Sequence, residues 1–394
     1  MTTLAHSLDE TPPLLDNLKR SSVLWLIWIA CLAIGSAGIY QRVTQGHLPA
    51  GYGSYVPWGL WVALYFHGVG LAGGVFLVAA GGYIWDCPGF KSKSVLRTAI
   101  VLSTAAMIPG FMAVWFDLGH MSRAIDIFLR PNFNSMMAFN AWMYSAFLAA
   151  AAVAWWLSFR ESTWLKPVLC LAGFFAILYP SQSGAFFGVV DSKPYWHSPV
   201  LPMLFLSAAV AAGTGLLMLT RWIVGSEDDS APDHSAAFGL MRKILLFSLI
   251  AYFVFEFAEF SILLWSPSSH TPELHLVLHG PYWWVFWIVH LLIGGVISLM
   301  LLLQRAQSGW IVASFLVAVT MVSGRLNVLI PGQAVNEIKG LQEAFWHERL
   351  TYIYHATPME YFVGLFLVAV GMAVFYAGRR INQALQISQA RGAK

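Results

Sequence analysis

Charged residues are scarce in this sequence. Asp, Glu, Lys and Arg make up only 10% of the 394 residues, whereas 58% are hydrophobic and the mean hydropathy is +0.66. Soluble domains carry about 25% charged residues, so this composition excludes a soluble protein. The apolar residues form long continuous runs instead of short alternating segments, which excludes a transmembrane β-barrel and predicts a multi-pass α-helical membrane protein. The net charge of +3 is spread over short loops, so we expect no nucleic-acid partner.

Cysteine motifs are also missing. Cys31, Cys87 and Cys170 stand alone, and none belongs to a CxxC or CxxCH sequence. Grouped cysteines of this kind hold iron–sulfur clusters and c-type haems, so we expect neither cofactor, nor a zinc site, in this chain. The first 21 residues are polar and lack a small-residue cleavage site after a short apolar core, which argues against a cleaved signal peptide.

Ten apolar segments come close to the ~20 residues that a transmembrane helix needs. We therefore predict an all-α integral membrane fold, a bundle of ten transmembrane helices. The expected spans are residues 22–40, 57–84, 95–117, 138–158, 164–187, 199–223, 243–265, 283–303, 310–331 and 358–378. They divide the chain into an N-terminal segment (1–21), a membrane domain (22–378) and a C-terminal tail (379–394).

The distribution of Lys and Arg predicts the orientation of the bundle. With the N-terminus in the cytoplasm, fifteen basic residues lie on the cytoplasmic side and six on the outer side, and Arg325 lies inside a span. The positive-inside rule then places both termini in the cytoplasm. The outer loops are long and rich in Trp, Tyr, Pro and His. They suit the docking of a partner protein, although interfacial aromatic belts have the same composition.

Two glutamates stand in a stretch otherwise fit for lipid, FVFEFAEFSILLW (253–265). A carboxylate at membrane depth is costly unless it is paired or exchanges a proton. At ~1.5 Å per helical residue, Glu256 and Glu259 lie roughly 20–24 Å along the seventh span and Arg325 roughly 22 Å along the ninth. We therefore expect Arg325 to pair with one of the glutamates while the other carries a proton. Glu259 is expected to be the more important of the two because it lies nearer the other polar groups of the outer half, and either glutamate can be the partner of Arg325.

Other polar side chains fall in the same outer half of the bundle, whereas the inner half is almost purely apolar. Asp117 ends the third span, and Pro180 is expected to break the fifth span close to Gln182. The remaining members are His67, Tyr65, Asn140, Tyr144, Ser183 and His290. A single intramembrane His more often bonds a neighbouring helix than takes part in chemistry, and a buried Glu–Arg pair is often only structural. The hypothesis of a site therefore rests on the concentration of these groups at one depth.

A quinone head group matches such a site. It needs a hydrogen-bonding group near each carbonyl oxygen, an apolar channel for its tail and a path for the protons that its oxidation releases. We assign the proton relay or ion pair to Asp117, Glu259, Glu256 and Arg325. We assign the quinone contacts to His67, Tyr65, Gln182, Tyr144, His120 and Asn140.

Several segments resemble one family of membrane subunits. PWGLWVALYFHGVGLAGG (57–74) is similar to the opening signature of the NrfD/PsrC family, and WFDLGHMSR (115–123) resembles its Asp-Leu-Gly segment. PSQSGAFFG (180–188), the helix with Glu259, GRLNV (324–328) and TPMEY (357–361) match its ten-helix, HybB-like branch with DsrP-type subunits in order and spacing. Two positions depart from the pattern: His120 and Met121 follow Asp-Leu-Gly where Arg-Pro is common, and His67 replaces an aliphatic residue.

The resemblance implies a multi-pass subunit of a redox complex in the bacterial inner membrane, of the kind used in anaerobic respiration. It implies a quinone or menaquinone substrate near the outer face and no prosthetic group in this chain. It also implies electron exchange with a ferredoxin-like partner that carries four-iron clusters, and a catalytic or cytochrome subunit beyond that partner.

Three other functions fit parts of the sequence. A b-type cytochrome would use His67 and His290 as haem ligands, although no repeated bis-His pattern is present. A secondary transporter would account for buried charges and broken helices, although the two halves show no internal repeat and the polar groups lie near one face instead of the midplane. A passive membrane anchor would need no site at all.

Overall fold

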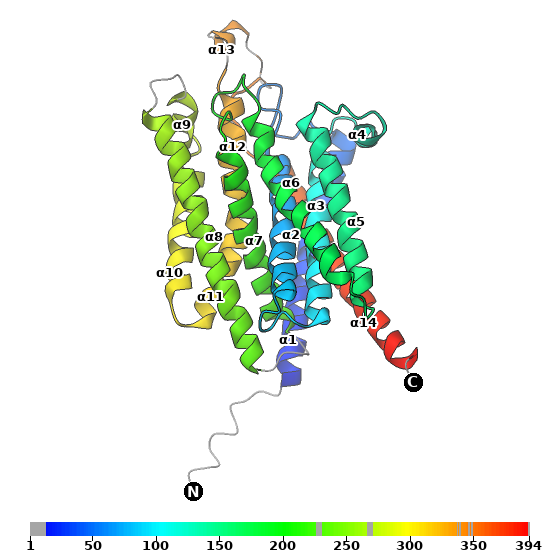
Figure 1. The fold of residues 1–394 in the computed structure, drawn as a ribbon. Helices are drawn as coiled ribbons and strands as arrows, with labels where there is room; N and C mark the ends of the chain where they lie inside the picture. The colour runs from blue at the N-terminus through cyan, green and yellow to red at the C-terminus, as the bar shows by residue number, and fades with distance from the viewer. Residues whose placement is uncertain are drawn as a thin grey trace.

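The computed structural model describes residues 13–225, 231–265, 271–336, 338, 340–345, 347 and 350–392. Within these residues the chain contains helices and no strand, and ten helices are long and apolar enough to cross a membrane. The predicted all-α fold class is therefore confirmed, and the protein is a multi-pass membrane protein. Figure 1 shows that α1 (Pro13–Gln45) begins and α14 (Pro358–Gly392) ends at the same end of the bundle.

We call this end the terminal end. The opposite, loop-rich end carries four short helices, η1 (Met121–Ile125), α4 (Asp126–Leu129), α9 (Thr271–Leu278) and α13 (Leu341–Ala344). That the loop-rich end faces outwards stays a prediction from the basic residues. Of those residues, Lys339, Arg349 and Lys394 lie outside the described part of the chain, as do residues 1–12 and 393–394 of the terminal segments.

Eight further spans lie between α1 and α14. They are α2 (Leu60–Ile84), α3 (Lys93–Asp117), α5 (Met136–Ser158), α6 (Leu165–Gly188), α7 (Leu201–Val224), α8 (Ala231–Trp265), η2 with α10 (Val285–Ile297 and Ser298–Leu303), and α11 with α12 (Gln307–Thr320 and Val322–Ala334). The predicted spans agree with these bounds to within a few residues, except that α1 and α8 begin earlier and α14 ends later. Hydropathy locates only the apolar part of a helix, and the polar residues at these three ends continue the helix beyond it.

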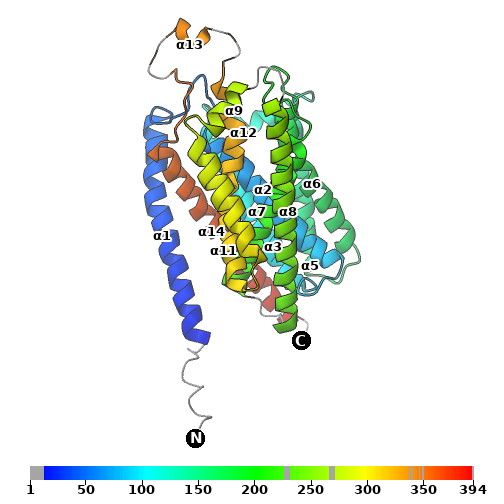
Figure 2. The ribbon, with the colours of Figure 1, turned by 90° about the vertical axis from the view of Figure 1, so that its left-hand side faces the viewer.

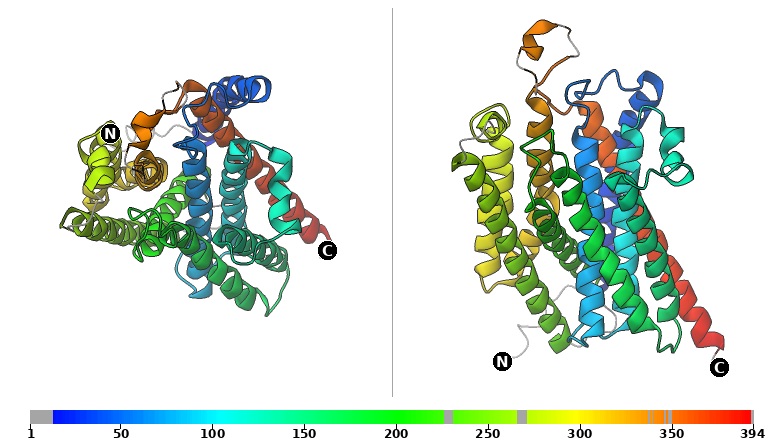
Figure 3. Two further views of the ribbon diagram at one scale, coloured as in Figure 1. Left: turned by 90° about the horizontal axis from the view of Figure 1, so that it is seen from above. Right: turned by 45° about the horizontal axis from the view of Figure 1, so that its top comes forward.

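The spans form two four-helix bundles side by side. The first bundle comprises α2, α3, α5 and α6, and the second comprises α7, α8, η2/α10 and α11/α12. Contacts of α7 and α12 with α2 join the bundles, and α1 packs on α14, which packs on α3 (Figures 2 and 3). The two outermost helices, α1 and α14, are also the least buried of the spans.

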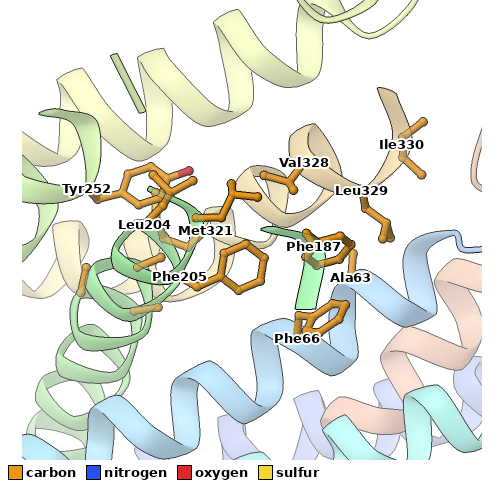
Figure 4. Close-up of a cluster of buried hydrophobic side chains, with 14 of the residues drawn as sticks. Ala63, Phe66, Phe187, Leu204, Phe205, Tyr252, Met321, Val328, Leu329 and Ile330 are labelled. Carbon is orange, nitrogen blue, oxygen red and sulfur yellow. The ribbon is translucent and has the colours of Figure 1, made fainter. Parts of the chain in front are cut away.

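An apolar core lies where the bundles meet. Figure 4 shows Phe66 of α2, Phe187 of α6 and Phe205 of α7 packed together. The ring centroid of Phe66 lies 5.3 Å from that of Phe187 and 5.9 Å from that of Phe205, distances at which aromatic rings attract each other. Tyr252 of α8 and Met321 between α11 and α12 extend the same cluster into the second bundle.

Two glycines allow the bundles to approach. A Cβ atom added to Gly74 of α2 would lie 1.9 Å from the carbonyl oxygen of Ala209 in α7, and one added to Gly213 of α7 would lie 2.5 Å from the Cα of Gly74. Small residues bring helix backbones together in membranes, where van der Waals packing drives association. Gly74, one of the glycines that follow His67 in α2, therefore serves helix packing.

Helix irregularity occurs at other places than predicted. The expected break at Pro180 is wrong, because α6 runs without interruption from Leu165 to Gly188. The ninth span is interrupted at Met321, between α11 and α12, and the eighth span is a π-helix from Val285 to Ile297. Proline at an interior position distorts a helix without necessarily ending it when neighbouring helices surround it.

Gly74→Ala is expected to destabilise the protein by about 1–3 kcal/mol, because a methyl group must push α2 and α7 apart. The matched control is Gly173→Ala in α6, where an added Cβ meets nothing within 4 Å. The midpoint of thermal unfolding in detergent measures both variants. Equal midpoints for the two variants would contradict the close packing of α2 on α7.

Candidate functional site

Glu256 of α8 and His290 of η2 form a buried pair in the second bundle. The Nε2 atom of His290 lies 2.9 Å and 3.0 Å from the two carboxyl oxygens of Glu256. The hydroxyl of Tyr252, one turn before Glu256, donates to the same carboxyl group at 3.0 Å. His290 is completely buried and Glu256 is 6% exposed. A carboxyl group at membrane depth thus has hydrogen-bond partners on two helices.

The hydrogen bonds around His290 leave one mobile proton in this pair. The Nδ1 atom lies 3.0 Å from the hydroxyl of Ser323, and that hydroxyl donates its own proton to the carbonyl oxygen of Thr320. Nδ1 must therefore carry a proton and donate it to Ser323. Nε2 then either accepts a proton from a neutral Glu256 or donates one to a charged Glu256. Moving one proton between the two groups interconverts these states without any rearrangement of heavy atoms.

The local backbone places these side chains. His290 lies within the π-helical part of the eighth span, and such segments occur frequently at functional sites. Ser323 lies in the first turn of the helix that follows the interruption at Met321. Gly324 provides the space, because a Cβ atom there would lie 2.4 Å from the Tyr252 hydroxyl and 3.2 Å from the His290 ring.

Glu259 lies one turn from Glu256 but has a different partner. Ser198, in the loop before α7, donates its hydroxyl to Glu259 at 2.5 Å. A small cavity lies between the two glutamates, with Tyr195 and Asn327 among its polar lining residues. The Tyr195 hydroxyl donates to the carbonyl oxygen of Asn327 at 2.8 Å. Burial raises the pKa of Tyr195 well above its ordinary value, and the nearby carboxyl groups add to that shift.

The expected ion pair of Arg325 with a glutamate is not formed. Arg325 donates from Nη2 to the carbonyl oxygen of Phe205 at 3.1 Å, and its guanidinium carbon lies 3.8 Å from the centroid of the Phe205 ring. The predicted depth is correct, because the adjacent Gly324 contacts Tyr252 and His290. Consecutive helical residues point about 100° apart, so Gly324 faces the glutamates while Arg325 faces α2 and α7. The buried cation therefore lies between the bundles, beside Gly70.

The first bundle holds a chain of hydroxyl groups. Tyr65 of α2 donates to Tyr144 of α5 at 2.9 Å, and Tyr144 bonds Ser183 of α6 at 3.0 Å. Three nearby atoms have no hydrogen-bond partner among the described residues, namely Asn140 Oδ1, Gln182 Oε1 and Tyr179 Oη. Asn140 lies one turn from Tyr144, Gln182 adjoins Ser183, and the Tyr179 ring lies 5.1 Å from that of Tyr144. Of the predicted quinone contacts, Tyr65 and Tyr144 are thus bonded to each other, and Asn140 and Gln182 lie within one helical turn of this chain along α5 and α6.

Asp117 lies nearer the loop-rich end, at the last residue of α3. Its Oδ1 atom is buried and has no hydrogen-bond partner in the described part of the chain. Arg42 of α1 donates to the carbonyl oxygens of Phe116 and Leu118 on either side of it, at 2.8 Å and 3.0 Å. Burial and the charge of Asp117 raise the pKa of the nearby Tyr52 above its ordinary value.

Two predicted histidines do not join these groups. His67 is buried, and its Nε2 atom lies 2.8 Å from the carbonyl oxygen of Ala318 in the last turn of α11. Helix ends leave carbonyl oxygens without helical donors, so His67 fastens α2 to the interrupted ninth span. His120 is exposed at the start of η1. Neither position supports the predicted quinone contact.

The sequence patterns do not identify several residues that contribute to the candidate site. Tyr252, Ser198, Ser323 and Asn327 are common residue types, and only the spacing of Tyr252 and Glu256, four residues apart on one helix face, marks any of them. Glu360 is marked in the sequence only as part of the family-like segment TPMEY (357–361). In the structure it is completely buried and accepts from the backbone N of Thr357 at 2.9 Å. This bond is the glutamate half of a capping box at the start of α14, and the same side chain accepts from the Tyr354 hydroxyl at 2.6 Å.

Comparison with known proteins identifies relatives over most of the chain. Residues 50–337 match the family model described as polysulphide reductase, NrfD. A selenate reductase subunit from Mesobacillus selenatarsenatis is 24% identical over 91% of this chain and 92% of its own length. The Hdr-like menaquinol oxidoreductase integral membrane subunit of Archaeoglobus fulgidus is 25% identical over 93% of this chain and 95% of its own. Protein NrfD of Escherichia coli is 20% identical over 64% of this chain and 85% of its own length.

His47, in the loop after α1, is expected to make stability depend on pH. Arg42 donates to its Nε2 at 2.8 Å, so Nδ1 carries the proton and donates to the Tyr52 hydroxyl at 2.6 Å. Burial and the charge of Arg42 lower the pKa of His47 below its ordinary 6.5. The unfolded chain therefore binds a proton more readily, and the free energy of unfolding falls as the pH drops below 6.5.

Thermal unfolding between about pH 7.5 and pH 5.5 tests whether stability falls towards acid pH. The midpoint should fall towards acid in the wild type and fall less in His47→Gln, which keeps hydrogen-bonding groups but does not titrate. Parallel curves for the two proteins would show that His47 contributes nothing to the pH dependence.

Proposed function

Because the chain belongs to the NrfD polysulphide reductase family, we propose that it is the membrane subunit of a quinone-linked oxidoreductase complex. The quinone head group binds in the first bundle, next to Tyr65 and Tyr144. The Glu256–His290 pair in the second bundle carries protons. Electrons pass between the quinone and an iron–sulfur partner subunit at the loop-rich end, and a catalytic or cytochrome subunit lies beyond that partner.

The observation that supports the quinone site is the set of unsatisfied polar atoms in the first bundle. Buried polar atoms are almost always hydrogen-bonded, and each exception needs an explanation. Asn140 Oδ1 and Gln182 Oε1 are acceptors without donors, and Tyr179 Oη is a donor without an acceptor. A quinol has two O–H donors, from which the two amide oxygens can accept, and a quinone has two carbonyl acceptors, one of which can accept from the Tyr179 hydroxyl. An apolar side chain cannot do this.

The side chains around these polar atoms also suit the ring and the isoprenoid tail of a quinone. Phe111 of α3 packs against the Tyr65 and Tyr144 rings and is partly exposed, as is Tyr65 itself. This edge of the bundle offers aromatic surface to the head group and opens to lipid for an isoprenoid tail. Relatives named as subunits of a selenate reductase and of a menaquinol oxidoreductase support a quinone substrate and a separate catalytic partner.

Oxidation of a quinol releases two electrons and two protons, and both protons need acceptors. Tyr144 relays a proton through its hydrogen bonds with Tyr65 and Ser183. Asp117, about 9 Å further along α3 than Phe111, holds an unbonded carboxyl oxygen towards the loop-rich end. In the second bundle the Glu256–His290 pair stores one proton. Reduction of a quinone runs the same steps backwards.

The rival functions fit the geometry less well. A bis-histidine haem needs His67 and His290 to face one another with free Nε2 atoms. They lie in different bundles, and each Nε2 is hydrogen-bonded within the protein. A transporter needs a substrate cavity beside its buried charges, whereas the cavity beside the glutamates has a volume of about 10 Å³. A larger cavity of about 80 Å³ lies at the terminal end of the bundle, away from the glutamates.

Tyr144→Phe is expected to lower kcat/KM for a short-tailed menaquinol analogue by about 10- to 100-fold, because it removes the hydroxyl that joins Tyr65 to Ser183 and leaves a buried group unbonded. The purified complex and an artificial electron acceptor provide the assay. Tyr83→Phe, in the same helix bundle but towards the terminal end, is the matched control. Unchanged kcat/KM in a fully assembled Tyr144→Phe complex would refute the quinone site.

Glu256→Gln is expected to reduce kcat by about 100-fold, the usual contribution of a positioned acid–base group, without loss of assembly. Glu259→Gln and Asp117→Asn test the other two carboxyl groups in the same way. Glu161→Gln is the control, because Glu161 is fully exposed and pairs with Lys93 at the surface. Wild-type turnover in all three intramembrane variants would show that none of these carboxyl groups takes part in proton transfer.

A further inference from the structure

A small cavity lies between Glu256 and Glu259, and a proton relay that uses both glutamates must cross it. Each glutamate has its own hydrogen-bond partners, and no direct bond joins their carboxyl groups in the described part of the chain. A proton cannot pass between them unless something bridges the gap. The cavity lies at this gap and is lined by both glutamates together with Tyr195, Leu201, Leu204, Phe260, Asn327 and Val328.

Asn327 points to what the cavity binds. Its side chain is 3% exposed, and its Nδ2 atom has no hydrogen-bond partner among the described residues. A buried amide without a partner costs about 1–3 kcal/mol, so an acceptor beside Asn327 stabilises the fold. The other polar groups of the cavity are two carboxyl groups and the Tyr195 hydroxyl, whose proton is already donated to the Asn327 carbonyl oxygen. The occupant must therefore both accept and donate hydrogen bonds.

The cavity has room for a single water molecule. Its volume of about 10 Å³ is close to the minimum that one water molecule requires, and a buried water needs two to four polar partners. Four such groups line the cavity. The apolar walls, Leu204 and Val328 among them, belong to the closely packed core between α7 and α12 (Figure 4) and leave no room for a larger ligand.

We infer that the cavity binds one structural water, which Asn327 orients between Glu259 and Glu256. The Asn327 amide donates to the water oxygen, and the water donates to a carboxyl oxygen of Glu256. When Glu259 is protonated and the Glu256–His290 pair has given up its mobile proton, the O–H bond of Glu259 breaks as the water accepts that proton, and the water passes one of its own protons to Glu256. The water is regenerated, and one proton has moved towards His290. Asn327 is a positioning residue, and this role rests on the proposed function of the glutamates.

A structure of the complete complex, at a resolution that shows ordered water, is the direct test. We expect one density peak at about 2.7–3.2 Å from Asn327 Nδ2 and from both carboxyl groups. A cavity without such a peak would overturn the inference. This result does not depend on turnover, so it stands apart from the test of the proposed function. Inactive glutamate variants with a dry cavity would support the relay and refute the water.

Asn327→Leu tests the role of the water by a second route. The leucine removes the donor at similar volume, and kcat should fall at least about tenfold, while KM for the menaquinol analogue stays unchanged because the quinone site lies in the other bundle. Asn327→Ser, which keeps a hydrogen-bond donor towards the water, should retain more activity than Asn327→Leu. Asn382→Leu removes a second buried Asn with an unbonded Nδ2 and should leave kcat unchanged. A change in KM together with kcat, or equal losses in Asn327→Leu and Asn382→Leu, would mark the effect as merely structural and refute the role.

Discussion

A carboxyl group inside a membrane must find hydrogen-bond partners within the protein, and this requirement organises the second bundle. Glu256 has two, Tyr252 on its own helix and His290 on the next. His290 in turn bonds Ser323, on a third helix. One acidic side chain thus fixes the relative positions of α8, η2 and α12. The same bonds place one proton between Glu256 and His290, so the interactions that offset the cost of burial also suit the pair to the proton transfer proposed for it.

The irregular backbone follows from the same constraint. Backbone groups that leave a regular helix need partners in a membrane, and this is tolerated only where protein surrounds them. The π-helix around His290 and the interruption at Met321 both lie against the Glu256 pair. His67, from the first bundle, bonds a carbonyl oxygen beside that interruption. A side chain that looks like a ligand in the sequence is therefore part of what makes the irregular helix possible.

The depth of the buried polar residues along the spans could be predicted from the sequence, but the direction in which their side chains point could not. Hydropathy located all ten spans, and counting residues along them placed Glu256, Glu259 and Arg325 at one level. Pairing depends on the rotation of each helix about its axis, which a nearly all-apolar span does not reveal, because its residues give no clear polar face. Gly324 and Arg325 illustrate this limit, since they share a level and face different bundles. The continuous helix at Pro180 and the exposed His120 also depend on tertiary contacts that no local pattern encodes.

Arg325 places a buried positive charge between the two bundles. Its guanidinium is balanced by a carbonyl oxygen and an aromatic face, and no carboxylate in the described part of the chain forms an ion pair with it. Charges in a low-dielectric interior interact over longer distances than in water, so this cation favours negative charge in both bundles. The cation also joins the bundles physically, because it bonds Phe205 of α7 and lies beside Gly70 of α2. Arg325 is therefore both a packing contact and an electrostatic link between the two bundles.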